Sequence, residues 1–293
     1  MRYALISDIH ANLPALEAVL SDIAGRANVD ATYHLGDLVG YGPWPNETIH
    51  RLRQTGIPGA AGNYDSTVAA GYKHCGCRYE DARQEELSHL SFAWTLAQTS
   101  NENKASLRSL PFRIDLRPFG GHAGGPTVTL LHGNQVLNTV YVHEDRTDDF
   151  LAKMGSAVGA RAGDVVCFGH THKPWHRVVD EIHFVNTGSV GRPKDGDPRA
   201  GYILLDVMES ERVVVEIVRV DYDVESVAKA ILASSLPDEF ADYLRTGGSW
   251  MAATVRDSGS GKRVVLQNHH GASAPAAYRG RRTVLGERSR RTR

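Results

Sequence analysis

The sequence lacks the features of a membrane, secreted or disulfide-rich protein. Its 293 residues include only three cysteines, Cys75, Cys77 and Cys167, and so small and odd a number argues against a disulfide framework. No apolar run approaches the roughly 20 residues that a membrane helix needs, and the first residues lack the apolar core and cleavage site of a signal peptide. We therefore expect a cytoplasmic protein with no membrane partner, and a core position for Cys167.

The sequence also lacks an excess of charge of either sign, because its net charge is −1. This balance hides an asymmetry, since residues 279–293 contain seven arginines and one acidic residue, and the rest has a net charge of −7. An acidic body is a poor match for nucleic acid, so nucleic-acid binding is expected at most through the basic tail. Residues 251–293 are rich in serine, glycine and arginine, which favours a disordered tail.

The first 65 residues alternate between strand and helix patterns. Short apolar runs predict strands at 3–7, 31–35 and 57–61. Apolar residues at helical spacing predict helices at 13–23 and 45–54. Alternation of this kind is typical of a largely parallel sheet with helices on its faces.

The remainder divides at a region of different composition. Residues 65–110 have mostly helical patterns, and we interpret them as an inserted helical cap near the site. Strands are expected at 113–116, 127–131 and 164–168, with several antiparallel strands within 176–220. Helices are expected near 148–158, 223–234 and 237–245. We therefore expect one folded domain over residues 1–250, with the cap inserted at about 65–110.

Five short segments end an apolar strand on a residue type that binds metals, usually beside glycine. These candidate ligands are Asp8 with His10, Asp37, Asn63, His132, and His170 with His172. In an open α/β sheet, ligands bind beyond the carboxyl ends of the strands, so the five segments should meet in one crevice. The two pairs are spaced two residues apart, which in extended backbone points both side chains the same way, so each pair could bind one ion.

The chemistry of the candidates narrows the choice of metal. A mixture of carboxylate, amide oxygen and imidazole suits Mn, Fe, Zn, Co or Ni, and lacks the all-oxygen character that Mg and Ca prefer. Taken singly, each segment has an ordinary explanation, such as a turn, a helix cap or a hydrogen-bonded core histidine. The occurrence of all five, each at a strand end, favours a metal site.

The order Asp-x-His, Gly-Asp, Gly-Asn, His-Gly, Gly-His-x-His resembles that of the calcineurin-like metallophosphoesterase superfamily over roughly residues 1–206. Two further segments, residues 40–43 and 186–193, resemble its small bacterial phosphodiesterase-like branch. The resemblance implies an α/β fold (α+β by some schemes), a four-layer sandwich of two β-sheets flanked by helices. Such a sandwich would account for the later antiparallel strands.

The resemblance also implies a site for two divalent metal ions. The candidates would divide into Asp8, His10 and His172 on the first ion, Asn63, His132 and His170 on the second, and Asp37 between them. A bridging hydroxide activated by both metals would attack phosphorus, and the metals would offset the charge on the oxygens. Among the ligands, Asp37, Asn63 and His132 are also expected to act in catalysis.

One position departs from the family pattern. Many members have histidine after Gly-Asn, as a general acid or a stabiliser of phosphate charge, whereas this chain has Tyr64. A tyrosine, with a pKa near ~10, is a weak proton donor at neutral pH. We therefore expect substrates with good leaving groups, such as aryl or cyclic phosphodiesters or nucleotide polyphosphates. The alternative is that Tyr64 only packs or hydrogen-bonds at the rim.

Two residues are weaker candidates for substrate binding. Asn12 lies just beyond the first motif and could contact phosphate, although a helix-capping role already explains it. Arg192 could bind substrate phosphate or simply lie on a loop surface.

Five other residues carry metal-ligand chemistry without completing a site. His74, Cys75 and Cys77 offer three zinc-ligand types without a fourth, so we favour a role in shaping the substrate site over zinc binding. His34 and His176 lie near motifs and are expected to pack or to support the ligands.

The leading hypothesis is a metal-dependent hydrolase of phosphodiesters or nucleotide-type phosphate esters, with a small phosphate ester as its substrate. A Ser/Thr-protein phosphatase or a dinucleoside polyphosphate hydrolase is an enzymatic alternative, since both share these motifs. A metal-binding regulatory scaffold with little catalysis is the non-enzymatic alternative, and it stays open because Tyr64 replaces the usual acid.

Overall fold

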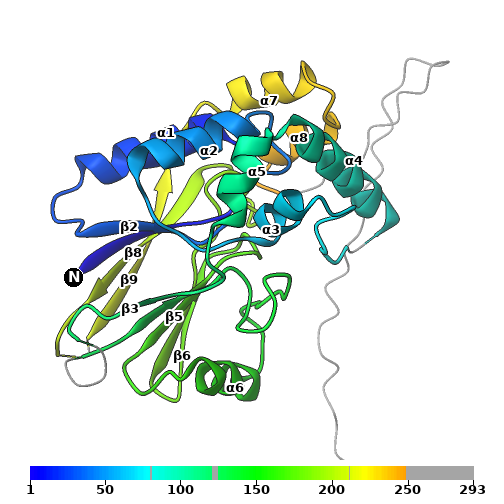
Figure 1. Ribbon diagram of the computed structural model, residues 1–293. Coiled ribbons are helices and arrows are strands. Elements are labelled where there is room, and N and C mark those ends of the chain that lie inside the picture. The colour runs from blue at the N-terminus through cyan, green and yellow to red at the C-terminus, as the bar shows by residue number, and fades with distance from the viewer. Residues whose placement is uncertain (80, 121–124, 211, 249–293) are drawn as a thin grey trace, which may run out of the picture. The chain divides into compact units, whose positions relative to one another are not determined.

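Two β-sheets lie face to face in the computed structural model, which describes residues 1–79, 81–120, 125–210 and 212–248 (Figure 1). The first sheet has the order β2-β1-β8-β9, with β1 at Arg2–Ile6, β2 at Ala31–His34, β8 at Ala200–Val207 and β9 at Val213–Val220. The second has the order β3-β4-β5-β7-β6, with β3 at Ile114–Leu116, β4 at Val128–Leu130, β5 at Val165–Phe168, β6 at Trp175–Val179 and β7 at Ile182–Asn186. Both sheets mix parallel and antiparallel pairs.

Strand β1 shows why the first sheet is buried on both faces. Successive side chains of a strand point to opposite faces. Tyr3 and Leu5 pack into the cluster between the two sheets, whereas Ala4 and Ile6 pack into the cluster under the helices. The apolar run of β1 therefore contributes side chains both to the core between the sheets and to the core under the helices.

Strand β5 plays the same part in the second sheet. Val165 and Cys167 face the first sheet, and Val166 and Phe168 face a third cluster that includes residues of helix α6 (Asp148–Val158). Cys167 is fully buried and unpaired, which confirms its expected place in the core. Four layers result: helices, sheet, sheet and helix, as the sequence resemblance implies.

The outer layers consist of helices whose positions agree with the sequence patterns. The first sheet is covered by α1 (Leu13–Gly25), α2 (Pro45–Thr55), α7 (Val224–Leu232) and α8 (Glu239–Arg245). The second sheet is covered by α6 (Asp148–Val158). Figure 1 shows α1 and α2 along one side of the paired sheets and α6 on the other. Within the described residues, no helix is long and apolar enough to cross a membrane.

Three helices occupy the region expected to form a cap. They are α3 (Asn63–Ala70), α4 (Ala82–Gln98) and α5 (Asn101–Arg108). Leu87, Phe92 and Leu107 are buried and join the cluster under the helices. The cap is therefore packed onto the helical layer, and the first residue of α3, Asn63, is one of the candidate ligands.

The expected strand at residues 57–61 does not form, so this prediction is wrong. Only Gly59 makes an isolated parallel bridge, with His34. Pro58 has no N–H to donate to a ladder, and the N–H of Ala61 donates to the carbonyl of Pro111 at 2.8 Å. The largely parallel sheet expected from the first 65 residues is likewise corrected to two mixed sheets, because β8 pairs antiparallel with β1. The predicted tail, 251–293, lies outside the described residues.

Candidate metal centre

The predicted strand ends of both sheets converge on one place. Asp8 and His10 follow β1, Asp37 follows β2, Asn63 begins α3, His132 follows β4, and His170 and His172 follow β5. All seven residues are buried, with exposed fractions of at most 3%. The whole predicted set of ligands is therefore brought together by loops from the two sheets.

Asp8, His10 and His172 form the first group that could hold a metal ion. The Nε2 atoms of the two histidines are 3.1 Å apart. The Oδ1 atom of Asp8 lies 3.2 Å from Nε2 of His172 and 3.8 Å from Nε2 of His10. This group contains the three residues that the resemblance assigns to the first ion.

Asp37, His132 and His170 form the second group. Nε2 of His132 lies 3.4 Å from Oδ2 of Asp37 and 3.2 Å from Nδ1 of His170. The Oδ1 atom of Asn63 approaches the same Nε2 at 3.1 Å, so the amide joins this group.

Asp37 lies between the two groups. Its Oδ2 atom is 3.4 Å from Nε2 of His132 and 3.7 Å from Nε2 of His10. Its Oδ1 atom accepts a hydrogen bond from the backbone N–H of Tyr64 at 2.9 Å. One carboxylate oxygen thus faces both histidine groups while the other is held by the start of the cap.

Backbone carbonyls determine which nitrogen of three histidines carries the proton. Each Nδ1 lies within hydrogen-bond distance of a backbone carbonyl oxygen. The oxygen of Val39 is 3.0 Å from Nδ1 of His10, that of Leu35 is 2.8 Å from Nδ1 of His132, and that of Arg192 is 2.6 Å from Nδ1 of His172. A carbonyl can only accept, so neutral rings carry the proton on Nδ1 and direct the Nε2 lone pair into the site.

The donor set fits a bound cation. The lone pairs of His10 and His172 face each other across 3.1 Å, an arrangement that is repulsive without a positive charge between them. The Oδ1 atom of Asp8 is buried beside them and has no hydrogen-bond partner in the part of the chain that the structure describes. Because a buried acceptor of this kind is costly unless it is satisfied, the geometry suits a metal ion.

Electrostatics keep most of the histidines neutral. Burial, followed by the charge of His172, lowers the pKa of His10 to about 3, and burial lowers the pKa of His170 and of His172 well below its ordinary value. Burial also disfavours protonation of His132, but Asp37 and Asp8 outweigh this effect and raise the pKa to about 9. Neutral imidazole is the form that binds metals.

The backbone is strained at five of the seven candidate ligands. Left-handed φ angles occur at Asp8 (52°), His10 (49°), Asp37 (54°), His170 (66°) and His172 (62°). Residues with a Cβ rarely adopt this conformation, which costs roughly 1–2 kcal/mol each, and such strain concentrates at functional sites.

These left-handed φ angles correct the prediction that the backbone is extended at the two pairs of ligands spaced two residues apart. In the left-handed turn, His170 and His172 enter different groups, so this pair does not belong to one ion. Asp8 and His10 do enter the same group, as the spacing predicts.

Two glycines allow the ligand loops to touch. A Cβ on Gly62 would lie 2.0 Å from Oδ1 of Asp37, and a Cβ on Gly169 would lie 2.5 Å from Oδ2 of Asp8. Neither distance is possible between non-bonded atoms. Glycine next to a ligand, which the motifs show repeatedly, is therefore a requirement of packing here.

Asp65 is a supporting residue that the sequence patterns did not identify. Its carboxylate accepts hydrogen bonds from the N–H groups of Asp37 (2.8 Å), Leu38 (2.9 Å) and Gly62 (2.9 Å). Burial, and then the charge of Asp37, raise its pKa to about 7. An acidic residue three positions after Gly62, in the first turn of α3, is the one signal that could have found it.

Tyr64 lies among aromatic rings. Its ring centroid is 5.6 Å from that of His10, 5.1 Å from that of Tyr41 and 5.7 Å from that of Phe92. Its hydroxyl is buried and has no hydrogen-bond partner among the described residues. Burial and the neighbouring Tyr41 raise its pKa well above the ordinary value, which makes it a still weaker proton donor.

We therefore expect Tyr64→Phe to keep turnover within about twofold and to leave stability unchanged or higher by about 1 kcal/mol, because it removes an unpartnered buried hydroxyl. Turnover of bis-p-nitrophenyl phosphate and urea unfolding would measure the two effects. Tyr72→Phe is a matched control, since Tyr72 is 61% exposed. A tenfold loss of kcat with an unchanged KM would instead identify Tyr64 as a proton donor.

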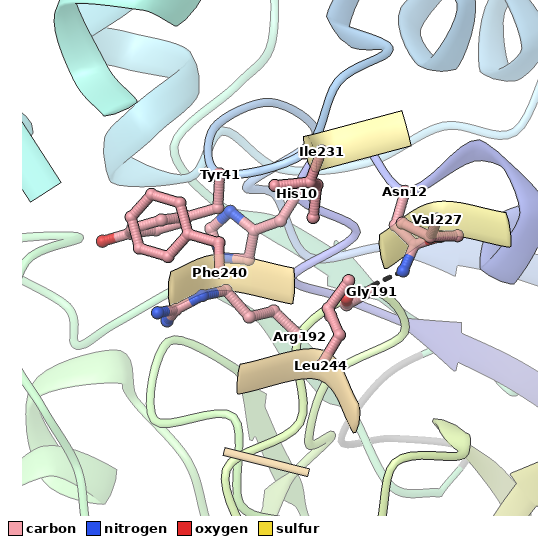
Figure 2. A pocket seen from close by; sticks show the side chains of 10 residues that line it. His10, Asn12, Tyr41, Gly191, Arg192, Val227, Ile231, Phe240 and Leu244 are labelled. Carbon is pink, nitrogen blue, oxygen red and sulfur yellow. Dashed lines mark hydrogen bonds between the residues drawn. The ribbon is translucent and has the colours of Figure 1, made fainter. Parts of the chain in front are cut away.

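The two candidate substrate-binding residues have different surroundings (Figure 2). Asn12 caps α1 by accepting from the N–H of Ala15 at 3.2 Å, and its amide donates to the carbonyl of Gly191 and to the hydroxyl of Tyr222. Both ends of this side chain already have protein partners, so a phosphate contact stays a prediction. Arg192 is only 6% exposed, and the expected alternative of a loop-surface position is wrong.

The two further histidines that lie near the motifs, His34 and His176, are outside the two metal groups. His34 is buried, burial lowers its pKa to about 4, and its ring fills the space next to Gly59. His176 is exposed on β6 and stacks on His183, with ring centroids 5.2 Å apart. Both positions agree with packing roles.

Cys75 and Cys77 form a disulfide, a single local pairing that the sequence analysis did not predict. Gly76 between them has a left-handed φ of 73°, which lets the chain turn back on itself. The sulfurs are therefore not available together as zinc ligands. The loop instead orients Asn63, whose amide donates to the carbonyl of Cys75 at 3.2 Å and to Sγ of Cys77 at 3.3 Å.

Comparisons with known proteins agree with this fold. The model of the calcineurin-like phosphoesterase superfamily domain matches residues 1–210. An uncharacterized protein of Methanocaldococcus jannaschii is 30% identical over 267 residues, which cover 83% of this chain and 97% of that protein.

Solved structures show the same likeness. A metallophosphoesterase from Sphaerobacter thermophilus is 30% identical, with a TM-score of 0.64, and the match covers 84% of this chain and 100% of that one. A hypothetical protein from Pyrococcus horikoshii OT3 shares the fold at 22% identity, with a TM-score of 0.69 and coverage of 84% and 98%. With the family model spanning well over half of its length, the chain belongs to the calcineurin-like phosphoesterase superfamily of metallophosphoesterases.

Proposed function

We propose that this protein hydrolyses phosphodiesters or nucleotide-type phosphate esters with the help of two divalent metal ions. The observation that carries the proposal is the pair of adjacent buried groups, each with one carboxylate and two histidines. In a purely structural cluster, neutral imidazoles whose lone pairs point at each other, as those of His10 and His172 do across 3.1 Å, would be unfavourable. Mn, Fe, Zn, Co or Ni would suit the mixed nitrogen and oxygen donors.

The candidate ligands would divide between the two ions. Asp8, His10 and His172 would hold one ion, Asn63, His132 and His170 the other, and Asp37 would bridge them, since its Oδ2 atom faces both groups. When bound, the ions supply Lewis acidity, lower the pKa of a bound water and balance charge on phosphate oxygens. Asp65 holds the loops of Asp37 and Gly62 in register.

The choice of esters rests on Tyr64, a poor proton donor at the position where many family members have an acid. Tyr64 has a raised pKa and a buried hydroxyl, and all four histidines of the two groups, His132 included, would be occupied as ligands. Without an acid to protonate it, a leaving group must be stable as an anion. Aryl diesters and nucleotide polyphosphates meet this condition better than simple alkyl monoesters.

A substrate panel with a metal count tests the proposal. The chain would be loaded with Mn²⁺, its metal content measured by mass spectrometry, and turnover compared for bis-p-nitrophenyl phosphate, p-nitrophenyl phosphate, cyclic nucleotides, dinucleoside polyphosphates and a phosphopeptide. We expect about two ions per chain and faster turnover of diesters or nucleotides than of the phosphopeptide. A phosphopeptide turned over faster than every diester would indicate a protein phosphatase, and bound metal without any turnover would indicate a scaffold.

A further inference from the structure

A pocket between the cap, α8 and the loop after β7 lies beside the metal centre. We call it the cap-side pocket, and its lining includes Arg78, Arg192 and Lys194 together with Tyr79, Tyr141 and Tyr243. The space within it is about 390 Å³, including its open mouth. Without that mouth the cavity volume is about 50 Å³, so only a small group of a ligand would fit inside it.

The walls of this pocket touch the candidate ligands directly. The ring of Tyr141 lies over His170, with centroids 4.0 Å apart, and Tyr41 meets His10 with centroids 5.1 Å apart. The backbone carbonyl of Arg192 holds His172 at 2.6 Å. A molecule bound through one phosphate at the metal centre would therefore extend into the cap-side pocket.

Arg192 is fixed in this wall by aromatic rings. Its guanidinium carbon lies 3.9 Å from the ring centroid of Tyr41 and 4.0 Å from that of Tyr243, and Phe240 is 5.6 Å away. Figure 2 shows its side chain beside Tyr41 and Phe240. Stacking covers the faces of a guanidinium and leaves its N–H groups at the edge, where they match phosphate oxygens.

The charge of the pocket is positive. Its described lining includes three cationic side chains and no acidic one. Within the described part of the chain, no carboxylate forms an ion pair with Arg192, although the side chain is only 6% exposed. A buried cation is costly without a counter-charge, so the arrangement favours an anionic ligand. At the metal centre, two divalent ions would by themselves balance the charge of a single phosphate when bound.

We propose that the cap-side pocket binds a second phosphate group of the substrate, next to the phosphate at the metal centre. The preferred substrates would then be esters with two neighbouring phosphates, as in nucleoside diphosphates and triphosphates. This inference rests on the proposed function, and it adds a selectivity that the metal centre alone does not provide. Arg192 would orient the second phosphate, and Lys194 and Arg78 would complete its surroundings from the loop and the cap.

Calorimetry with inorganic orthophosphate and pyrophosphate tests the second-phosphate site without requiring turnover. In the Mn²⁺-loaded full chain, we expect pyrophosphate to bind at least about tenfold more tightly than orthophosphate, the effect of one good charged contact. Arg192→Gln should reduce this preference about tenfold. The double variant Arg78→Gln with Lys194→Gln should also reduce it, and because Arg78 is exposed and Lys194 half-buried, it tests the site even if Arg192→Gln fails to fold.

Lys153→Gln is the matched control, since it removes one positive charge at an exposed ion pair on α6. Its preference for pyrophosphate should equal that of the unchanged chain. Equal affinity for the two anions, or variants that weaken both equally, would overturn the second-phosphate site. If bis-p-nitrophenyl phosphate is still hydrolysed in that case, the proposed function stands alone. A clear preference for pyrophosphate without turnover of any ester would instead overturn the proposed function and support the second-phosphate site.

Discussion

Replacing Asp37 with alanine is expected to lower metal affinity and ester turnover by more than about 100-fold. Loss of a group that merely supports a ligand already costs roughly 10–100-fold in metal affinity or activity, and Asp37 faces both histidine groups from a buried position. Metal content by mass spectrometry and kcat/KM on an aryl diester would measure the effect. Added Mn²⁺ should raise the melting temperature of the unchanged chain but not that of the variant.

Two further variants separate this effect from simple misfolding. Asp37→Asn keeps the shape and tolerates the left-handed backbone, so it should fold well while losing the carboxylate charge. Asp149→Ala removes an exposed carboxylate from an ion pair on α6 and should change neither metal content nor turnover. Retention of two ions and normal turnover in Asp37→Ala would show that the bridging role is wrong.

Gly62→Ala should be almost as damaging, although glycine has no side chain to lose. Its new Cβ would lie 2.0 Å from Oδ1 and 2.2 Å from the backbone nitrogen of Asp37, so one of the two loops must move. Overpacking of this kind typically costs roughly 1–3 kcal/mol. We expect destabilisation of that size in urea unfolding, and a loss of metal affinity of at least about tenfold, because the displaced group is Asp37.

Gly25→Ala provides the comparison, since a Cβ there would meet nothing within 4 Å and Gly25 lies at the end of α1. Alanine favours helix by up to about 1 kcal/mol over glycine, so this variant should be neutral or slightly more stable with unchanged metal content. If Gly62→Ala matched Gly25→Ala in both measurements, close contact between the Asp37 and Gly62 loops would not be essential.

Much of the fold is encoded locally and was predictable for that reason. The apolar period of residues 148–158 and the capping side chain of Thr147, which accepts from the N–H of Phe150, define α6 without reference to the rest of the chain. The same holds for α1, where Asn12 caps the helix. Partition into two sheets was not predictable in this way, because nothing local in β8 shows that it pairs with β1, about 200 residues earlier.

The candidate ligands were predictable because their chemistry shows in the residue types. Three features were not. The turn of Cys75 onto Cys77 depends on the backbone at Gly76, which has no marker in composition. The task of Asp65 depends on N–H groups supplied by a loop 27 and 28 residues away. The segment at 57–61 has a strand composition, but only Gly59 forms a bridge, with His34, and the N–H of Ala61 donates to the carbonyl of Pro111.

The origin of the ligands in both sheets has a mechanical consequence. Asp8 and His10 come from the first sheet and His172 from the second, while Asp37 comes from the first and His132 from the second. Each bound ion would therefore act as a cross-link between the two halves of the sandwich. Binding energy at such a link resists shear between the sheets, and amide protons in both sheets would gain protection from exchange together. Metal occupancy would thereby make the two sheets unfold as one cooperative unit.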